Sequence, residues 1–299
     1  MNKTKIWLIA AAFLTVAGLI IFAGAISAAD WSFDMLNTNK YETNTHEITD
    51  GFENISIETD TADITFLASD DGKCKVICFE ETNLKHTVIV TDGTLAIKRP
   101  SKKWYEHIGI NFKAPNITVY LPTAQYASLY IKESTGDVTV PKDFGFSTAT
   151  VILSTGDVKF SANTEELLKI KTSTGRISVS DIICGDVTLT VSTGKTEIKN
   201  VKCKNLSSEG NTGRITLESV IAEEKLSIER STGDVKLDMC DAQEIDIETD
   251  TGDVEGTLLS EKIFFAETDT GRVDVPKSTV GGKCEVKTDT GDIKIGLRQ

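Results

Sequence analysis

From residue 131 onward, apolar residues alternate with polar ones around a recurring Thr-Gly pair. Aliphatic residues stand five positions before most of these glycines and two positions after them, as Ile228 and Val235 do around Gly233. Alternation with a period of two is typical of β-strands. Each repeat therefore predicts two strands that meet at the Thr-Gly pair, followed by a variable segment that leads into the next repeat.

The repeat is regular enough to predict the fold. Nine glycines carry it at spacings of 19 or 20 residues, each preceded by Thr and followed by Asp, Arg or Lys: Gly136, Gly156, Gly175, Gly194, Gly213, Gly233, Gly252, Gly271 and Gly291. A propeller blade needs about 40 residues. We therefore predict an all-β fold, a parallel β-solenoid with about 19–20 residues in each coil (one turn of the solenoid). Coils stack about 4.7–4.9 Å apart, and glycine suits the corners because it accepts positive φ.

The first 29 residues have a different character. Lys3 and Lys5 precede a stretch without any charged residue, from Ile6 to Ala29. About 20 apolar residues cross a bilayer, so residues 6–29 predict a single transmembrane anchor. By the positive-inside rule the basic head stays inside and the C-terminal part lies outside the cell membrane. Small residues before Asp30 leave open the alternative of a cleaved signal peptide.

The chain divides into four expected segments. They are a basic head with a membrane anchor (1–29), a polar linker (30–50), irregular strands that cap the solenoid (51–130), and the regular solenoid (131–299). Within the third segment, Asn54–Phe66 has the phase of the repeat with Ala62 in place of glycine, which predicts a degenerate first coil. The stretch 100–115, with a basic and aromatic cluster at 101–107, predicts a loop.

A family resemblance rests on these motifs. The Thr-Gly-Asp-Val repeats, the strand Ile117–Pro122 and the segment Gly51–Ile57 are similar to those of the bacterial "putative adhesin" family of β-strand-repeat surface proteins. The resemblance covers about residues 50–299. It implies the repeat architecture and attachment at the cell surface, and it supplies no catalytic residues.

Charge and composition exclude several functions. The chain has 45 acidic and 32 basic residues and a net charge of -13, whereas nucleic-acid binding needs a basic face. Its three histidines (His46, His86 and His107) are far apart in sequence, which argues against a histidine-based metal or acid–base site. There is no phosphate-binding glycine loop and no Gly-x-Ser-x-Gly motif. We therefore expect no catalytic residues and no cofactor.

Aspartates near the corners are the candidate metal ligands. They are Asp250 and Asp253, Asp289 and Asp292, and Asp269 on the intervening coil. Stacked carboxylates can bind Ca²⁺, which takes 6–8 oxygen ligands. The alternative is that Asp is common in turns because it bonds its own backbone, on a face that is simply solvated. Such carboxylates could also cleave glycans, but a glycosidase needs one acid in an apolar setting, and residues beside a corner glycine are exposed.

Two further patterns concern cysteine and threonine. Cys184 and Cys203 each follow a corner glycine by nine residues, so they should stack on neighbouring coils within disulfide range. A reduced buried pair is the alternative, because Cys packs as a small apolar residue. The lack of a second closely spaced Cys pair beside Cys74 and Cys78 argues against zinc. Threonines three positions before several corners share the phase of the inward aliphatics, which favours stacked structural hydroxyls over an exposed ice-binding array.

We expect a membrane-anchored, extracellular, non-catalytic surface interaction module that binds a cell-envelope component, a surface polymer or a membrane protein. One alternative is an accessory of a cell-envelope stress system, and another is a polysaccharide-acting enzyme on the same scaffold. Because the sequence ends a few residues past the last repeat, at Gln299, the last coil should leave an open strand edge. Such an edge can pair with a second copy of the chain, so we expect self-association there.

Overall fold

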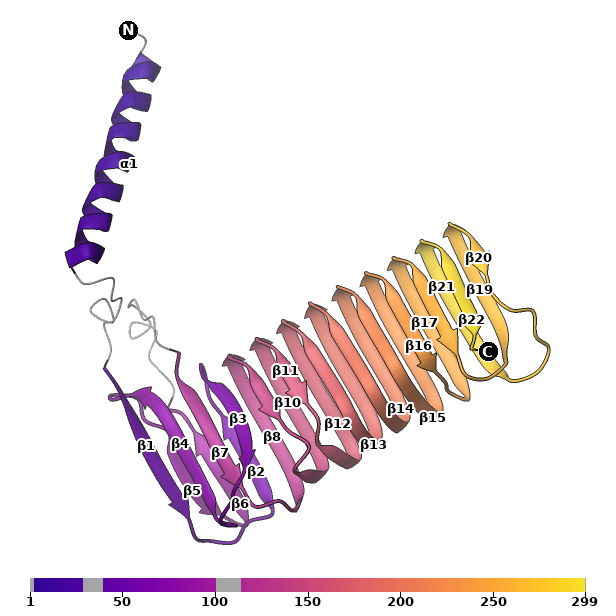
Figure 1. The fold of residues 1–299 in the computed structure, drawn as a ribbon, viewed down its shortest axis with the longest axis horizontal. Helices are drawn as coiled ribbons and strands as arrows, with labels where there is room; N and C mark the ends of the chain where they lie inside the picture. The colour runs from indigo at the N-terminus through magenta and orange to yellow at the C-terminus, as the bar shows by residue number, and fades with distance from the viewer. Residues whose placement is uncertain (1–2, 29–39, 101–113, 299) are drawn as a thin grey trace.

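The computed structural model describes residues 3–28, 40–100 and 114–298, and it contains one helix and a long stack of strands (Figure 1). The basic and aromatic cluster at 101–107 lies outside these residues. The elements are α1 Lys3–Ala28, β1 Tyr41–Ile48, β2 Asn54–Glu58, β3 Asp63–Ala68, β4 Cys74–Glu81, β5 Thr87–Thr91, β6 Thr94–Lys98, β7 Asn116–Leu121, β8 Gln125–Thr135, β9 Val138–Val140, β10 Gly145–Thr155, β11 Val158–Phe160, β12 Asn163–Thr174, β13 Ile177–Thr193, β14 Thr196–Thr212, β15 Ile215–Thr232, β16 Val235–Cys240, β17 Glu244–Thr251, β18 Val254–Leu258, β19 Lys262–Thr270, β20 Val273–Asp274, β21 Gly282–Thr290 and β22 Ile293–Leu297.

The regular part is a parallel β-solenoid, as predicted. Neighbouring coils pair in register, so that Thr174 lies opposite Thr193, and Thr193 opposite Thr212. The aliphatic residues on both sides of each corner point inward and form one continuous core that runs the length of the stack. The rod is therefore held together by the same few contacts repeated in every coil.

Each corner requires glycine for two reasons. The nine corner glycines have φ between 133° and 157°, which L-residues with a side chain rarely adopt. In addition, a Cβ atom at Gly194 would overlap the carbonyl oxygen of Gly175 on the adjacent coil, and the other corners repeat this contact. At four corners, a threonine three positions before the glycine donates its hydroxyl to a stacked glycine carbonyl, as Thr288 does to Gly252 over 3.1 Å.

The cap over the N-terminal end of the rod combines two kinds of pairing. β2 and β3 form the degenerate coil predicted around Ala62, because they pair in parallel with β8 and β9 of the first regular coil. Beyond them, β6 and β7 continue the parallel stack, while β4 lies antiparallel to β7 and β1 antiparallel to β4. The antiparallel strands β4 and β1 therefore cover the N-terminal end of the parallel stack.

One boundary in this region needs correction. The expected linker 30–50 includes β1, whose inward side chains include Asn44, His46 and Ile48. Most inward residues of β1 are polar, so apolar and polar residues do not alternate along it. The sequence pattern therefore gave no sign of a strand here. The strand is defined by its pairing with β4 along its whole length.

The last coils do not stack in sequence order. β21, from the ninth repeat, lies between β17 and β19, and β22 lies between β18 and β20 (Figure 1). The final coil of the sequence is therefore an interior coil. The prediction that it forms the open edge is wrong, and the edge belongs to β19 and β20 of the preceding repeat.

Candidate functional site

The corner aspartates hold neighbouring coils together. Asp253 Oδ1 accepts the backbone N–H of Asp292 over 2.8 Å, and Asp292 Oδ1 accepts that of Arg272 over 2.9 Å. The same bond joins Asp137 to the N–H of Asp157 near the other end of the rod. A carboxylate in this position therefore has a structural role that explains why Asp often follows the glycine.

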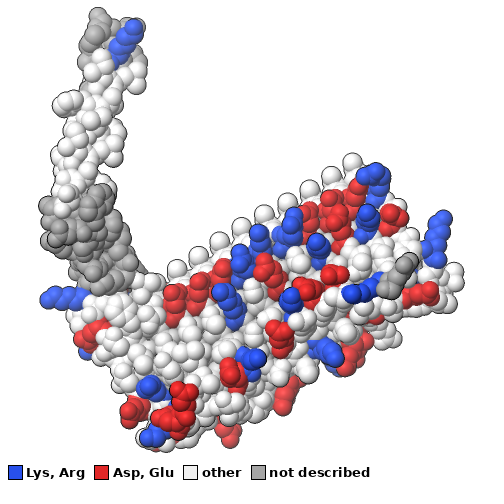
Figure 2. Space-filling model, viewed as in Figure 1, with Lys and Arg blue, Asp and Glu red and all other residues white. Residues whose placement is uncertain are grey.

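The other three calcium candidates lie on the outer surface. Asp250, Asp289 and Asp269 are exposed and follow stacked threonines on adjacent coils. They form an exposed acidic column at the end of the rod, and calcium binding there remains a prediction. Along the rest of the rod, basic and acidic side chains are interspersed (Figure 2).

All six cysteines are buried and free. Cys184 and Cys203 do lie on neighbouring coils, since the residues before them, Ile183 and Lys202, are paired. Burial raises the pKa of Cys184 to about 11 and that of Cys203 to about 12. No bond joins the two sulfurs in this structure, and a disulfide between them stays a prediction.

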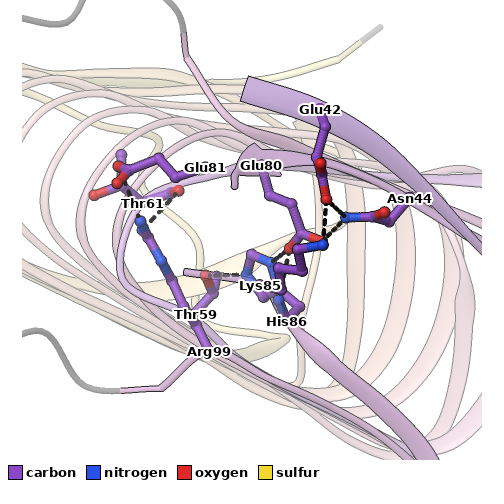
Figure 3. A network of polar contacts seen from close by, with 9 residues as sticks. All are labelled: Glu42, Asn44, Thr59, Thr61, Glu80, Glu81, Lys85, His86 and Arg99. Atoms are coloured by element: carbon purple, nitrogen blue, oxygen red, sulfur yellow. Dashed lines mark hydrogen bonds and ion pairs between the residues drawn. The ribbon is translucent and has the colours of Figure 1, made fainter. Parts of the chain in front are cut away.

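A buried polar cluster in the cap was not predicted (Figure 3). Glu80, at the end of β4, is 1% exposed and accepts hydrogen bonds from the backbone N–H of His86 and from the Asn44 amide. The Nδ1 atom of His86 lies 2.6 Å from the same Glu80 carboxylate. On the other side of the ring, Nε2 lies 2.9 Å from the hydroxyl of Thr59. Three separate segments thus meet at one imidazole.

The cluster is flanked by two ion pairs. Glu81 and Arg99 form a largely buried pair at 3.2 Å, and Lys85 pairs with Glu42 at the surface over 2.5 Å. Glu42 also accepts a bond from Asn44, the residue that holds Glu80. Through Asn44, the Lys85–Glu42 pair therefore links the surface of the cap to the buried Glu80 carboxylate.

The sequence carried one signal for this cluster. Cys74, Val76, Cys78 and Glu80 alternate along β4 in the inward phase, so Glu80 was bound to be buried. The contact with His86 could not be read from the sequence because it depends on the chain reversal between β4 and β5. The argument against a histidine-based site rested on the distances between the three histidines in the sequence, and it did not anticipate these contacts of His86.

The cluster brings together metal-ligating atoms. Cys78, Glu80 and His86 each place a ligand atom within 4.8 Å of the others, and all three residues are buried. Burial lowers the pKa of His86, with the Glu80 hydrogen bond acting in the opposite direction, and burial raises the pKa of Cys78 to about 12. The arrangement can act either as a hydroxyl–imidazole–carboxylate chain or as a set of metal ligands.

A cleft of about 840 Å³ opens at the opposite end of the cap strands. Its lining combines aromatic rings with carboxylates and lysines, and includes Phe52, Tyr120, Tyr126, Asp70 and Asp71. Phe52 stacks on Tyr126 with ring centroids 6.0 Å apart, which fixes one wall. The volume falls in the range of small-ligand sites, about 300–1,000 Å³.

One family model matches the chain, and several solved structures are similar to it. A family model described as Toastrack DUF4097 matches residues 52–295. A crystal structure of a "putative adhesin" from Bacteroides fragilis shares 20% identity, covering 87% of this chain and 98% of that one, with a TM-score of 0.49. For Parabacteroides distasonis, a "putative lipid binding protein" shares 13% and a "putative adhesin" 11%; each comparison covers 88% of this chain and 98% of the other, with a TM-score of 0.46. No curated protein matches the chain in sequence.

Proposed function

We propose, from the premise that the chain belongs to the Toastrack DUF4097 family, that it is a membrane-tethered surface interaction module without catalytic activity. The family match confirms the resemblance stated from the repeat motifs. The observation that carries the proposal is the aromatic and acidic cleft, which is built into the cap of a rigid rod. Solenoids typically present such extended, fixed binding surfaces.

The tether is α1. Within the described residues, Trp7–Ala25 is a 19-residue stretch with a mean hydropathy of 2.4, and none of it is buried against the protein. Apolar side chains without a packing partner are stable in the hydrocarbon of a bilayer. A retained helix places the rod on the outer face of the membrane, and the mass of the mature protein distinguishes it from a cleaved leader.

The cleft favours a polymer segment as its ligand. The rings of Tyr120 and Phe52 offer flat apolar faces, and Asp70 and Asp71 offer hydrogen-bond acceptors and negative charge. Lys75 lies over the Tyr120 ring, with Nζ 4.6 Å from its centroid, and so holds that ring in place. This chemistry suits a surface polymer that carries hydroxyl groups or cationic groups on a ring-shaped repeat.

The corner geometry supports a non-catalytic role. Asp253 and Asp292 accept backbone N–H groups, and the hydrogen bonds from Arg272 lower the pKa of Asp292. A glycosidase instead needs a protonated carboxylic acid in an apolar environment. The cap cluster of Thr59, Glu80 and His86 lines neither the 840 Å³ cleft nor the two smaller clefts found on the rod among the described residues.

The test is binding of the full-length protein in liposomes to isolated cell envelope and to a panel of glycans and matrix proteins. We expect saturable binding at about 0.15 M salt, where exposed charges are largely screened. Asp70→Lys and Tyr120→Ser should each weaken it by about tenfold, equivalent to about 1.4 kcal/mol. Glu248→Lys, a matched charge change on an exposed part of the rod, should leave it unchanged.

Two results would contradict the proposal. One is binding that persists unchanged in both cleft variants, and the other is the absence of saturable binding to every fraction. Capture of a membrane protein that requires α1, with no role for the cleft, would favour the accessory role in an envelope stress system.

The open edge of the rod supports self-association. β19 pairs with β21 on one side, and among the described residues no strand pairs with its other side. Phe265 on this strand is 55% exposed, and Ile263 and Val273 are also exposed nearby. We expect the full-length protein in detergent to form a dimer that Phe265→Lys disrupts, as measured by sedimentation. A wild-type monomer at all concentrations would contradict this.

A further inference from the structure

Glu80 is a buried carboxylate that accepts no hydrogen bond from Lys or Arg among the described residues, because the nearby Lys85 pairs with Glu42 instead. Its hydrogen-bond partners among the described residues are the Asn44 amide and two groups of His86, the backbone N–H and the ring. Two of these donors are neutral, and the third is cationic only if the imidazole is protonated. Burying a carboxylate without a directly bonded, permanent counter-charge is costly, so this position favours a bound cation.

The surrounding donors define which cation fits. Cys78 lies two residues before Glu80 on the same inward face of β4, and its sulfur lies within 4.8 Å of the ligand atoms of Glu80 and His86. Zn²⁺ accepts thiolate, imidazole and carboxylate together, whereas Ca²⁺ and Mg²⁺ take oxygen ligands. Around a tetrahedral zinc ion, ligand atoms lie about 3.3–3.8 Å apart, so a small adjustment closes the set.

A fourth group lies on the neighbouring strand. Asn44 is opposite Cys78 in the pairing of β1 with β4, and His46, two residues further along the same face, is opposite Val76. The Nε2 atom of His46 is buried and has no hydrogen-bond partner. A buried ring nitrogen without a partner is uncommon in folded proteins and calls for a ligand or an ion.

We propose that Cys78, Glu80 and His86 bind a zinc-class divalent cation in the cap, and that the ring of His46, which lies outside this set of three, turns to supply the fourth ligand. The outer contacts of such a site are already in place. Thr59 contacts the Nε2 atom of His86 and leaves Nδ1 facing the ion, and Asn44 orients the Glu80 carboxylate. Outer partners of this kind fix the ring orientation of a metal-bound histidine.

Ion binding replaces one contact in the cluster. The His86 Nδ1–H that now faces Glu80 gives way to the ion, and the ring proton moves to Nε2, where it is donated to the Thr59 hydroxyl. Cys78 binds as a thiolate, and its proton is released to solvent. The ion then joins β4, β1 and the segment before β5, so it stabilises the cap rather than creating a reactive centre.

The test uses the full-length protein in detergent, reduced, stripped of metal with a chelator and titrated with Co²⁺. We expect one equivalent to bind, with a thiolate-to-cobalt charge-transfer band that Zn²⁺ abolishes by competition. Cys78→Ser should remove the band, and Cys284→Ser, an equally buried cysteine of the rod, should keep it. Thr59→Val keeps all the ligands and should weaken binding by about 10–100-fold.

X-ray absorption of the zinc-loaded wild-type protein provides a second test that needs no variant. One sulfur among nitrogen and oxygen neighbours supports the site, and a shell without sulfur overturns it. The proposal is also overturned if the wild-type protein binds no Co²⁺, or if the band survives Cys78→Ser. In those cases Glu80 and His86 form only a structural pair. None of these outcomes depends on the proposed binding function.

Discussion

Glu133 should make the junction between the rod and its cap sensitive to pH. It stands three positions before the Gly136 corner and is only 3% exposed. Its Oε1 atom accepts the backbone N–H of Ala62 over 2.7 Å, while Oε2 has no partner. Burial raises the pKa of Glu133 to about 8, opposed by the Ala62 bond and reinforced by Asp63, Asp137 and Asp60.

The sign and size of the effect follow from linkage. An unfolded glutamate has a pKa of about 4.3, so between this value and about 8 the folded protein holds a proton that the unfolded chain has lost. The contribution of Glu133 is therefore fully present below the unfolded pKa and is lost as the pH rises through the folded pKa. The full difference corresponds to a loss on the order of 5 kcal/mol, of which roughly 4 kcal/mol falls between pH 5 and pH 9.

Urea denaturation at pH 5, 7 and 9, followed by circular dichroism, measures this loss. The free energy of unfolding of the wild-type protein should fall by on the order of 4 kcal/mol relative to Glu133→Gln between the two extremes. Glu248→Gln, at an exposed position, should follow the wild type. Parallel pH curves for the wild type and Glu133→Gln would refute the reasoning, since they would show that Glu133 titrates alike in both states.

Three further predictions test the packing of the rod. Gly194→Ala should lower the free energy of unfolding, measured in urea, by about 2–4 kcal/mol, because it adds backbone strain and an overlap with the adjacent coil. The control Gly51→Ala, where a Cβ atom would stand in open space, should change the free energy of unfolding by less than about 0.5 kcal/mol. Arg230 is buried and donates a hydrogen bond to Ser208. Ser208→Ile alone should destabilise the protein, but combined with Arg230→Thr it should show a favourable coupling of about 1–3 kcal/mol in a double-mutant cycle. Additive effects of the two substitutions would contradict this. Met239 has φ of 53°, and Met239→Gly should raise stability by about 0.5–1 kcal/mol in thermal denaturation; a lower Tm would show that its side-chain contacts outweigh the strain.

The rod could be predicted because each coil satisfies the same local constraints. A Thr-Gly corner with aliphatic residues at fixed distances specifies the backbone turn, the inward face and the register together. Even the exceptions in this pattern are compensated locally. Ser208 and Gly210 are small where other coils have larger residues, and the Arg230 guanidinium from the next coil lies against both.

The cap cluster could not be predicted because its members come from separate strands. Asn44, Glu80 and His86 meet only after β1 has paired with β4 and the chain has reversed into β5. Neither event leaves a repeating pattern. The inward phase of Glu80 on β4 shows that it needs a partner but not which residue supplies one. Asp181 and Asn200 have positive φ and mark a second turn in consecutive coils. This turn could not be predicted from a glycine either, because neither position has one.

The exchanged order of the last coils has a local cause that the sequence contains. Gly281 and Gly282 are the only adjacent glycines of the chain, and they stand where the chain enters the gap between two earlier coils. A Cβ on Gly281 would overlap the carbonyl oxygen of Glu261 on one side, and a Cβ on Gly282 would overlap that of Gln243 on the other. Any side chain here would hold the neighbouring coils apart. The ninth coil therefore fills the gap between the seventh and the eighth, and the exposed edge is left to the eighth, where Phe265 lies.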